Sequence, residues 1–181
     1  ILFHTDAVQA ANYLSCDTKK LGVDALTLSG HKIYGPKGIG VLFVDNRTSL
    51  VPLIHGGSQE ESRRAGTENV PAIVGMGKAI DLIKKRDNKK TKDLRDLLVK
   101  NILENIDGTQ LNGDKEKRLP NNANISFSKI EGESILFALN EEGFCVSTGS
   151  ACSSEKLEPS HVLLAIGKTA EQAHGSIRFS L

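Results

Sequence analysis

The sequence predicts an α/β protein, because short apolar runs typical of strands alternate with longer segments of helical periodicity. Residues 40–44 are almost wholly apolar, which indicates a strand buried on both faces of a sheet. Residues 124–130 alternate between polar and apolar side chains, which indicates a strand with one buried face. Residues 70–86 repeat apolar side chains at the spacing of an amphipathic helix.

The first part of the chain is expected to carry a small set of strands followed by a loop and a helix. These elements are strands at 1–3, 25–28 and 40–44, a loop at 55–69 and the helix at 70–86. The helix should start with Asn69 as its N-cap and Pro71 in its first turn. The side chains expected to face the core from it are Ile73, Val74, Ile80 and Ile83.

Residues 87–92 are polar and basic, and this shift in composition predicts a boundary between two domains, residues 1–87 and 88–181. The elements expected beyond it are helices at 94–106, 131–142 and 159–166 and strands at 124–130, 144–147 and 176–181. The first of these helices should end at Asp107 and Gly108. The side chains expected in this core are Leu94, Leu97, Leu98, Ile102, Ile106, Ile135, Leu136 and Leu139.

Composition limits the function classes. The chain has 181 residues, with 23 basic and 22 acidic side chains and a net charge of +1, which gives no electrostatic reason to expect nucleic acid or a membrane surface as a partner. No apolar run is long enough to span a bilayer, and no secretory signal is visible. The three cysteines lack disulfide-framework or zinc-ligand spacing, so we expect a cytoplasmic protein without a metal site. Because both ends lie inside apolar runs and no methionine begins the chain, we expect a fragment.

Lys32 follows the predicted strand at 25–28 within the segment SGHKIYGPKG. Glycines on both sides of it allow backbone or a ligand to approach closely. A fixed, partly desolvated lysine amine can form a Schiff base with a carbonyl cofactor. A lysine in a glycine-rich turn between two strands is an equally good interpretation of this segment alone.

Cys152 lies among small residues in the segment VSTGSACSS, without the large apolar neighbours that surround most structural cysteines. A thiol in such a loop is a candidate nucleophile, and an incidental loop thiol is the alternative. Cys145, between Phe144 and Val146, is expected to be a core residue. Cys16 is expected to be incidental.

Three further polar residues are candidates for ligand binding. Asp6 follows the first predicted strand, where its carboxylate could cap a helix or pair with a protonated heterocycle nitrogen. Gln9 could point at the same ligand if a helical turn begins there. Arg178 lies in the last predicted strand, on the opposite face from its neighbours Ile177 and Phe179. It could form an ion pair or grip a carboxylate in a bidentate fork.

Four segments, in this order, resemble motifs of the pyridoxal-phosphate-dependent cysteine desulfurases of iron–sulfur cluster assembly and nitrogen fixation, in the class-V aminotransferase superfamily. They are SGHKIYGPKGIG, HGGSQEESRRAGTENVPAIVG, STGSACSSEKLEPSHVLLAIG and AHGSIRFSL. The resemblance covers essentially the whole chain. It implies the fold of type I pyridoxal-phosphate transferases, with the C-terminal part of the large domain at 1–87 and most of the small α+β domain at 88–181.

The resemblance also implies a cofactor site for pyridoxal 5'-phosphate. Lys32 would hold the cofactor as a Schiff base, Asp6 would pair with its ring nitrogen, and Gln9 would bond its phenolic oxygen. Ser29 and His31 would contact the phosphate. Thr67 would contact the phosphate of the neighbouring subunit, which implies a homodimer.

The activity implied is removal of sulfur from L-cysteine, giving L-alanine and a persulfide on Cys152, with Arg178 binding the substrate carboxylate. Acceptor proteins such as an iron–sulfur scaffold would then take the sulfur, for cluster assembly or tRNA thiolation. Family members are longer, and their upstream phosphate-binding loop and ring-stacking histidine have no counterpart here. We therefore expect this chain alone to bind little cofactor.

Other functions stay open at this point. One is another enzyme of the same fold type, such as a selenocysteine lyase or an aminotransferase, and an aminotransferase would not need Cys152. Another is a catalytically incomplete fragment that only docks partners. Metal binding by Cys152 with His55, His161 or His174 lacks any ligand spacing.

Overall fold

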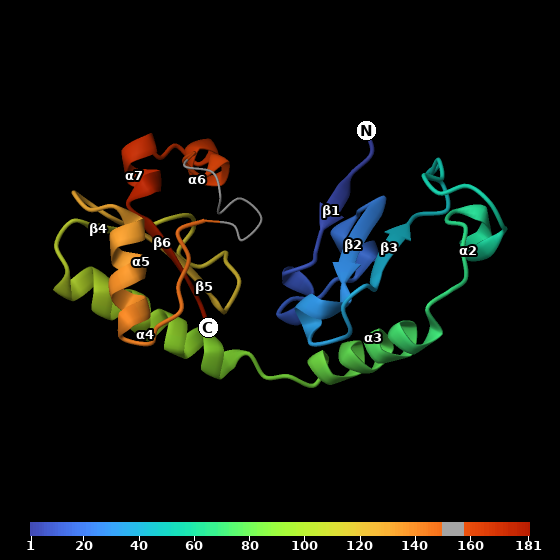
Figure 1. Ribbon diagram of the computed structural model, residues 1–181, viewed down its shortest axis with the longest axis horizontal. Helices are drawn as coiled ribbons and strands as arrows, with labels where there is room; N and C mark the ends of the chain where they lie inside the picture. Colours follow the sequence, from blue (N-terminus) through green and yellow to red (C-terminus); the bar gives the residue numbers. More distant parts are fainter. Residues whose placement is uncertain (150–157) are drawn as a thin grey trace. The chain divides into compact units, whose positions relative to one another are not determined.

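The computed structural model describes residues 1–149 and 158–181, which form two compact units (Figure 1). The first unit is Ile1–Arg86 and the second is Asp87–Leu181. This division lies one residue before the expected boundary at 87. The assignment of the two parts to a large and a small domain stays a prediction.

The sheet of the first unit has the order β1 (His4–Asp6), β2 (Ala25–Ser29), β3 (Gly40–Val44). β1 runs parallel to β2, and β3 runs antiparallel to it. The strand predicted at 1–3 is wrong, because the ladder begins at His4, opposite Ala25. Just before the ladder, the Phe3 carbonyl accepts hydrogen bonds from the Asp24 and Ala25 amides, at 2.8 and 3.2 Å.

The prediction that β3 is buried on both faces is also wrong. Val41 and Leu42 are exposed, and only Val44 is fully buried. β3 pairs with β2 alone among the described residues, so it is an edge strand there. One core cluster of this unit consists of Leu26 of β2 with Ala7 and Val23, and Phe43 of β3 packs against it.

The helices of the first unit are η1 (Ala10–Asn12), α1 (Thr18–Leu21), η2 (Gly30–Ile33), α2 (Gln59–Ser62) and α3 (Val70–Ile83). The start of α3 confirms the predicted cap, because the Asn69 side chain accepts a hydrogen bond from the Ala72 amide at 3.3 Å. The buried face of α3 differs from the expected one, however. It consists of Ala72, Met76 and Ala79, whereas Ile73 and Val74 are exposed and Ile80 and Ile83 are partly buried.

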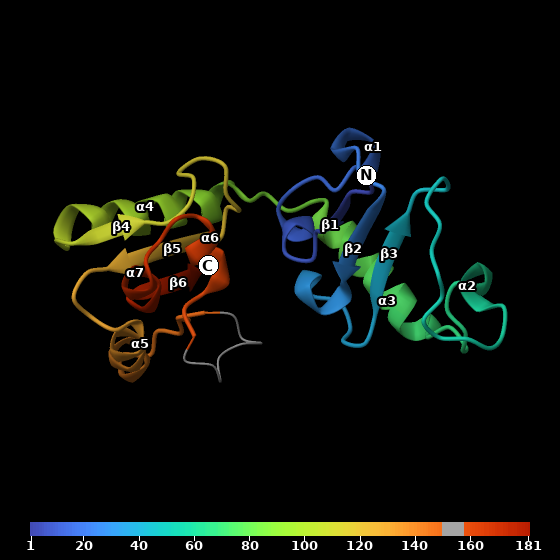
Figure 2. The ribbon, with the colours of Figure 1, turned by 90° about the horizontal axis from the view of Figure 1, so that it is seen from above.

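The second unit has an antiparallel sheet, β4 (Thr109–Leu111), β5 (Asn122–Phe127) and β6 (Ser176–Ser180), with helices α4 (Lys89–Asn105), α5 (Gly132–Glu141), α6 (His161–Ala165) and α7 (Ala170–His174). α4 lies on one face of the sheet, and α5 lies on the other (Figure 2). Val99 of α4 packs on Ala123 and Ile125 of β5. β5 ends three residues before the predicted position 130, and Lys129 beyond it has a φ of 64°.

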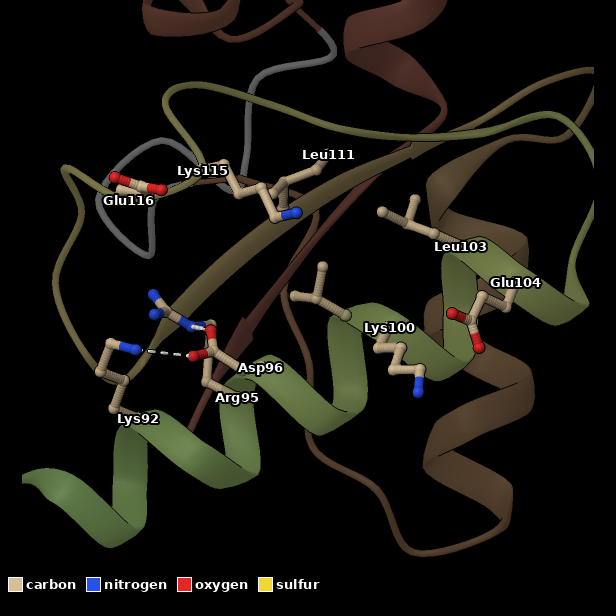
Figure 3. A pocket seen from close by; sticks show the side chains of 10 residues that line it. Lys92, Arg95, Asp96, Lys100, Leu103, Glu104, Leu111, Lys115 and Glu116 are labelled. Atoms are coloured by element: carbon tan, nitrogen blue, oxygen red, sulfur yellow. Dashed lines mark hydrogen bonds and ion pairs between the residues drawn. The ribbon is translucent and has the colours of Figure 1, made fainter.

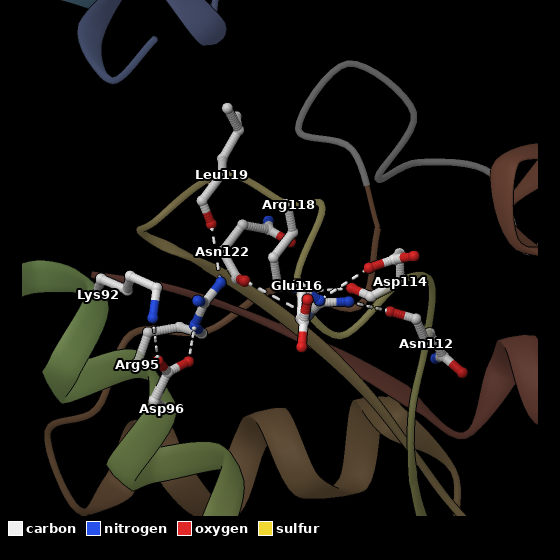
Figure 4. A network of polar contacts seen from close by, with 9 residues as sticks. All are labelled: Lys92, Arg95, Asp96, Asn112, Asp114, Glu116, Arg118, Leu119 and Asn122. Atoms are coloured by element: carbon white, nitrogen blue, oxygen red, sulfur yellow. Dashed lines mark hydrogen bonds and ion pairs between the residues drawn. The ribbon is translucent and has the colours of Figure 1, made fainter.

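Arg95 is a buried charge in α4 that the apolar pattern did not indicate. Its side chain is 2% exposed, and its guanidinium donates to Asp96 at 2.7 Å and to the Leu119 carbonyl at 3.1 Å (Figure 4). Burial, and then the neighbouring charge of Arg95, lower the pKa of Arg118. Arg95 and Val99 are the buried residues of α4, and the expected core residue Ile102 packs partly against the same core. The expected core residues Leu94, Leu97 and Ile106 are exposed.

We expect Arg95→Met to destabilise the protein by about 2 kcal/mol, because it removes a buried donor of α4 and leaves the Leu119 carbonyl without its hydrogen bond. Lys92→Met is the matched control, since Lys92 pairs with the same carboxylate of Asp96 but its side chain is 56% exposed. That change should cost less than about 0.5 kcal/mol. Urea denaturation followed by circular dichroism measures both, and equal losses would contradict the assignment.

Candidate functional site

The parallel pairing of β1 and β2 brings most of the predicted site residues to one edge of the first unit's sheet. Asp6 ends β1 opposite Thr27, and β2 continues to Ser29. Each strand then leads into a 3₁₀ helix, η1 after β1 and η2 after β2, and the two helices contact each other. We call this carboxyl-terminal edge of β1 and β2, with η1 and η2, the strand-end site. Ligands of α/β sheets commonly bind at such edges.

Asp6 and Gln9 lie on the β1 side of the strand-end site. One oxygen of the Asp6 carboxylate accepts a hydrogen bond from the Val8 amide at 2.9 Å. This bond fixes the side chain and leaves the second oxygen to bind another group. Gln9 is the N-cap residue of η1, so a helical turn does begin there, and both side chains are exposed.

Lys32 lies on η2, in a turn that is anchored from inside the protein. The next residue, Ile33, is buried against Met76 and Ala79 of α3, while Lys32 itself is exposed. Gly30 begins the turn where no side chain fits, because a Cβ there would lie 2.7 Å from Cγ2 of Ile39. The glycine before Lys32 therefore serves close backbone packing, and the lysine amine projects from a fixed turn.

Two polar side chains just before Lys32, Ser29 and His31, contact each other, which the sequence did not predict. Oγ of Ser29 and Nδ1 of His31 are 2.9 Å apart and form a hydrogen bond.

His4, which was not predicted, lies two positions before Asp6 on the same face of β1. Its Nε2 is 2.8 Å from Oγ1 of Thr27. The signal for His4 was its place in the polar run His4-Thr5-Asp6 at the strand end.

Thr67 lies outside the sheet edge, in the loop between α2 and α3. The α2 turn just before this loop is strained, because Glu60, Glu61 and Ser62 have φ values of 50°, 57° and 62°. Consecutive non-glycine residues rarely adopt this left-handed conformation. Arg64 ties the turn together by pairing with Glu60 at 3.2 Å and donating to the carbonyl of residue 66 at 2.7 Å, immediately before Thr67.

We expect Ser62→Gly to stabilise the protein by about 1 kcal/mol, because glycine adopts a positive φ without the clash between Cβ and backbone. Ser58→Gly is the control, since the φ of Ser58 is −88° and glycine brings no relief there. Thermal unfolding compares the two variants. No gain in melting temperature for Ser62→Gly over Ser58→Gly would contradict the left-handed turn.

Arg178 belongs to the second unit and lies on β6 opposite Asn124. Phe179 packs against the core beneath α4, and Ile177 is fully buried opposite Ile125, so the predicted alternation is confirmed. The Arg178 backbone pairs with Ser147, and its Nη1 donates to the Gly149 carbonyl at 2.5 Å. Arg178 forms no ion pair with any residue that the structure describes.

The three cysteines have different outcomes. Cys152 lies outside the described residues. The prediction that Cys145 is a core residue in a strand at 144–147 is wrong, because its side chain is exposed and only Ser147 makes a strand-type pair. Cys16 is half-buried, and burial raises the pKa of its thiol, which disfavours the reactive thiolate.

Two cavities lie away from the strand-end site. The larger, of about 600 Å³, lies in the second unit between α4 and the segment after β4, and charged side chains such as Lys92, Arg95 and Lys115 line it (Figure 3). The other, of about 450 Å³, lies beside α1 and the end of β3. None of the predicted site residues lines either cavity.

The described residues show neither a metal-ligand cluster nor a membrane-spanning helix. Residues 1–149 and 158–181 contain no group of three or more His, Cys, Asp or Glu side chains placed to hold a metal ion. No helix over the same residues is long and apolar enough to cross a membrane.

Comparisons with known proteins agree over the whole chain. The profile of the family described as Aminotransferase class-V matches residues 1–181. A protein named cysteine desulfurase IscS from Dictyoglomus turgidum is 54% identical over 184 residues, which cover 100% of this chain and 47% of that relative. The chain spans about half the length of the curated relatives it matches.

Solved structures give the same result. The X-ray structure of a NifS-like protein from Rickettsia africae is 35% identical with a TM-score of 0.86, and the match covers 99% of this chain and 48% of that one. The structure of SspA in complex with cysteine is 38% identical with a TM-score of 0.78, and the match covers 100% of this chain and 50% of that one. These matches confirm the predicted α/β fold.

Proposed function

Because this chain belongs to the class-V aminotransferase family, we propose that it is part of a cysteine desulfurase, which removes sulfur from L-cysteine and leaves L-alanine. The observation that carries the proposal is that Asp6 and the turn bearing Lys32 follow two parallel paired strands at the same edge of the sheet. The relatives that match the whole chain are named for this activity, which supports the choice of reaction within the family.

The side chains of the strand-end site fit pyridoxal phosphate, on which members of this family depend. Lys32 offers an amine that would hold the aldehyde carbon covalently. The free oxygen of Asp6 would accept a hydrogen bond from the ring nitrogen, and Gln9 would bond the ring's phenolic oxygen. The hydrogen-bonded pair Ser29 and His31 would bind the phosphate.

Bound pyridoxal phosphate supplies an electron-withdrawing ring that stabilises negative charge at the α-carbon of the substrate. Once the amine of the substrate has released Lys32, the free lysine amine would act as the general base that takes the α-proton. Arg178 binds the substrate carboxylate with the donors that Gly149 does not use. The Lys32 amine and the remaining guanidinium donors of Arg178 form no side-chain hydrogen bond with another residue that the structure describes, so they are available for these roles.

Cys152 completes the proposed reaction as the nucleophile. Its thiolate attacks the sulfur of L-cysteine, so a sulfur–sulfur bond forms while the carbon–sulfur bond breaks. The electron pair of the broken bond stays with the carbon, which takes up a proton and becomes the methyl group of alanine. The sulfur remains on Cys152 as a persulfide, ready for an acceptor protein such as an iron–sulfur scaffold.

The quaternary structure and location follow from the same proposal. Thr67 would contact the phosphate in a neighbouring subunit, so the enzyme would act as a homodimer. Arg64 and the strained turn would hold Thr67 in place for that contact. The free thiols of Cys16 and Cys145 support a reducing compartment such as the cytoplasm.

The experiment that tests the proposed function is a product assay on the holoenzyme with L-cysteine and a reducing thiol. We expect alanine and sulfide to form in equal amounts. With 2-oxoglutarate added as the amino acceptor, keto acid formation from L-cysteine without alanine would identify an aminotransferase instead. A much higher rate with L-selenocysteine would identify a selenocysteine lyase, and no turnover of any of these substrates would leave a docking role.

A further inference from the structure

Tyr34 ends the turn that carries Lys32, and it does so in an unusual backbone conformation. Its φ and ψ are 65° and 18°, in the left-handed region that a bulky side chain seldom occupies. From there its amide donates to the Gly30 carbonyl and closes η2. The shape of the turn around Lys32 therefore depends on what keeps Tyr34 in this conformation.

Core packing does not hold the Tyr34 ring, which is largely exposed. Arg86, the last residue of the first unit, holds it instead. Nη1 of Arg86 donates to the Tyr34 hydroxyl at 3.2 Å, and its guanidinium carbon lies 5.3 Å from the ring centroid, within cation–π distance. The hydrogen bond from Arg86 lowers the pKa of Tyr34, as expected for a phenol beside a guanidinium.

The same nitrogen of Arg86 also reaches the other turn of the strand-end site. It donates to Oδ1 of Asn12 at 3.4 Å. Asn12 is 5% exposed and ends η1, the turn that follows Asp6 and Gln9. One guanidinium therefore connects the turn after β1, the turn after β2 and the C-terminal end of α3.

We infer that Arg86 is a positioning residue for the strand-end site, which holds η1 and η2 together and fixes the Lys32 turn through Tyr34. The inference rests on the proposed role of Lys32. Ile33 anchors the inner side of the turn in the core, so Arg86 constrains only its outer side. Loss of Arg86 should therefore move Lys32 relative to Asp6 without unfolding the unit, and small displacements of a reacting group slow catalysis.

The test compares Arg86→Met with Arg47→Met in the holoenzyme. Arg47 is a surface arginine of the same unit that pairs only with Asp45 among the described residues. We expect Arg86→Met to lower kcat for L-cysteine roughly fivefold, with KM unchanged, and Arg47→Met to change neither. Equal kcat values in the two variants would overturn the inference.

Hydrogen exchange provides a readout that does not depend on activity. The amides of Tyr34 and Gly35 both donate to the Gly30 carbonyl and should exchange faster in Arg86→Met than in Arg47→Met. Faster exchange confined to the end of α3 would show that Arg86 only caps that helix, and would overturn the inference. If the wild type lacks desulfurase activity, the proposed function fails, while this comparison still decides whether Arg86 holds the turn.

A double-mutant cycle tests the route through Tyr34. Tyr34→Phe removes the hydroxyl that accepts from Arg86 and keeps the ring. If Arg86 acts through Tyr34, the double variant should lose little more kcat than Arg86→Met alone. Losses that multiply would show that the two residues act independently, against the inference.

Discussion

Replacing Lys32 with alanine should lower kcat for L-cysteine roughly 10³-fold or more, because the change removes both the covalent anchor of the cofactor and the general base. Folding should survive the change. Lys32 is exposed, and the apolar anchor of its turn is the neighbouring Ile33, which stays in place. The stability of the variant should therefore lie within about 0.5 kcal/mol of the wild type.

Lys37→Ala is the matched control for this prediction. Lys37 lies in the same glycine-rich segment and is also exposed, but it follows η2 and is not part of the turn. We expect its kcat to equal that of the wild type. Retained activity in Lys32→Ala, or equal losses in the two variants, would contradict the proposed role of Lys32.

Cys152→Ser should abolish persulfide formation, because a serine hydroxyl is far less nucleophilic toward sulfur than a thiolate. Production of alanine should fall by roughly 10²-fold or more, since the carbon–sulfur bond then lacks its nucleophile. Mass spectrometry after addition of L-cysteine measures the persulfide as one added sulfur atom. The binding of L-cysteine should persist, because Arg178, which binds its carboxylate, remains.

Cys145→Ser is the control for Cys152→Ser. Cys145 has an exposed thiol close in sequence, so it tests whether any accessible cysteine can accept the sulfur. We expect this variant to form the persulfide and alanine as the wild type does. A persulfide that disappears in Cys145→Ser and persists in Cys152→Ser would reverse the assignment.

The elements that the sequence predicted well are those set by local signals. β2 and β3 follow short, mainly apolar runs, and the start of α3 follows an asparagine cap with an early proline. Core positions were predicted less well. α3 buries two alanines and a methionine, and α4 buries Arg95, because close packing and a buried hydrogen bond outweigh side-chain hydrophobicity there.

In the candidate site, too, local features were predicted and tertiary contacts were not. The sequence identified Lys32 and Asp6 as polar residues at strand ends, but it did not predict that β1 and β2 run parallel, which brings them to one edge. It also missed the contact of Arg86 with Tyr34 and Asn12. These three residues lie on separate elements, so their contact depends on tertiary structure that no local pattern reports.

The central claim is that the strand-end site holds pyridoxal phosphate on Lys32, and peptide mapping tests it most directly. Borohydride reduction of the holoenzyme makes the bond between lysine and cofactor permanent, and digestion with mass spectrometry then locates the modified residue. We predict one label per chain, on Lys32. A label on Lys37 or another lysine, or no label on a holoenzyme with desulfurase activity, would contradict the account.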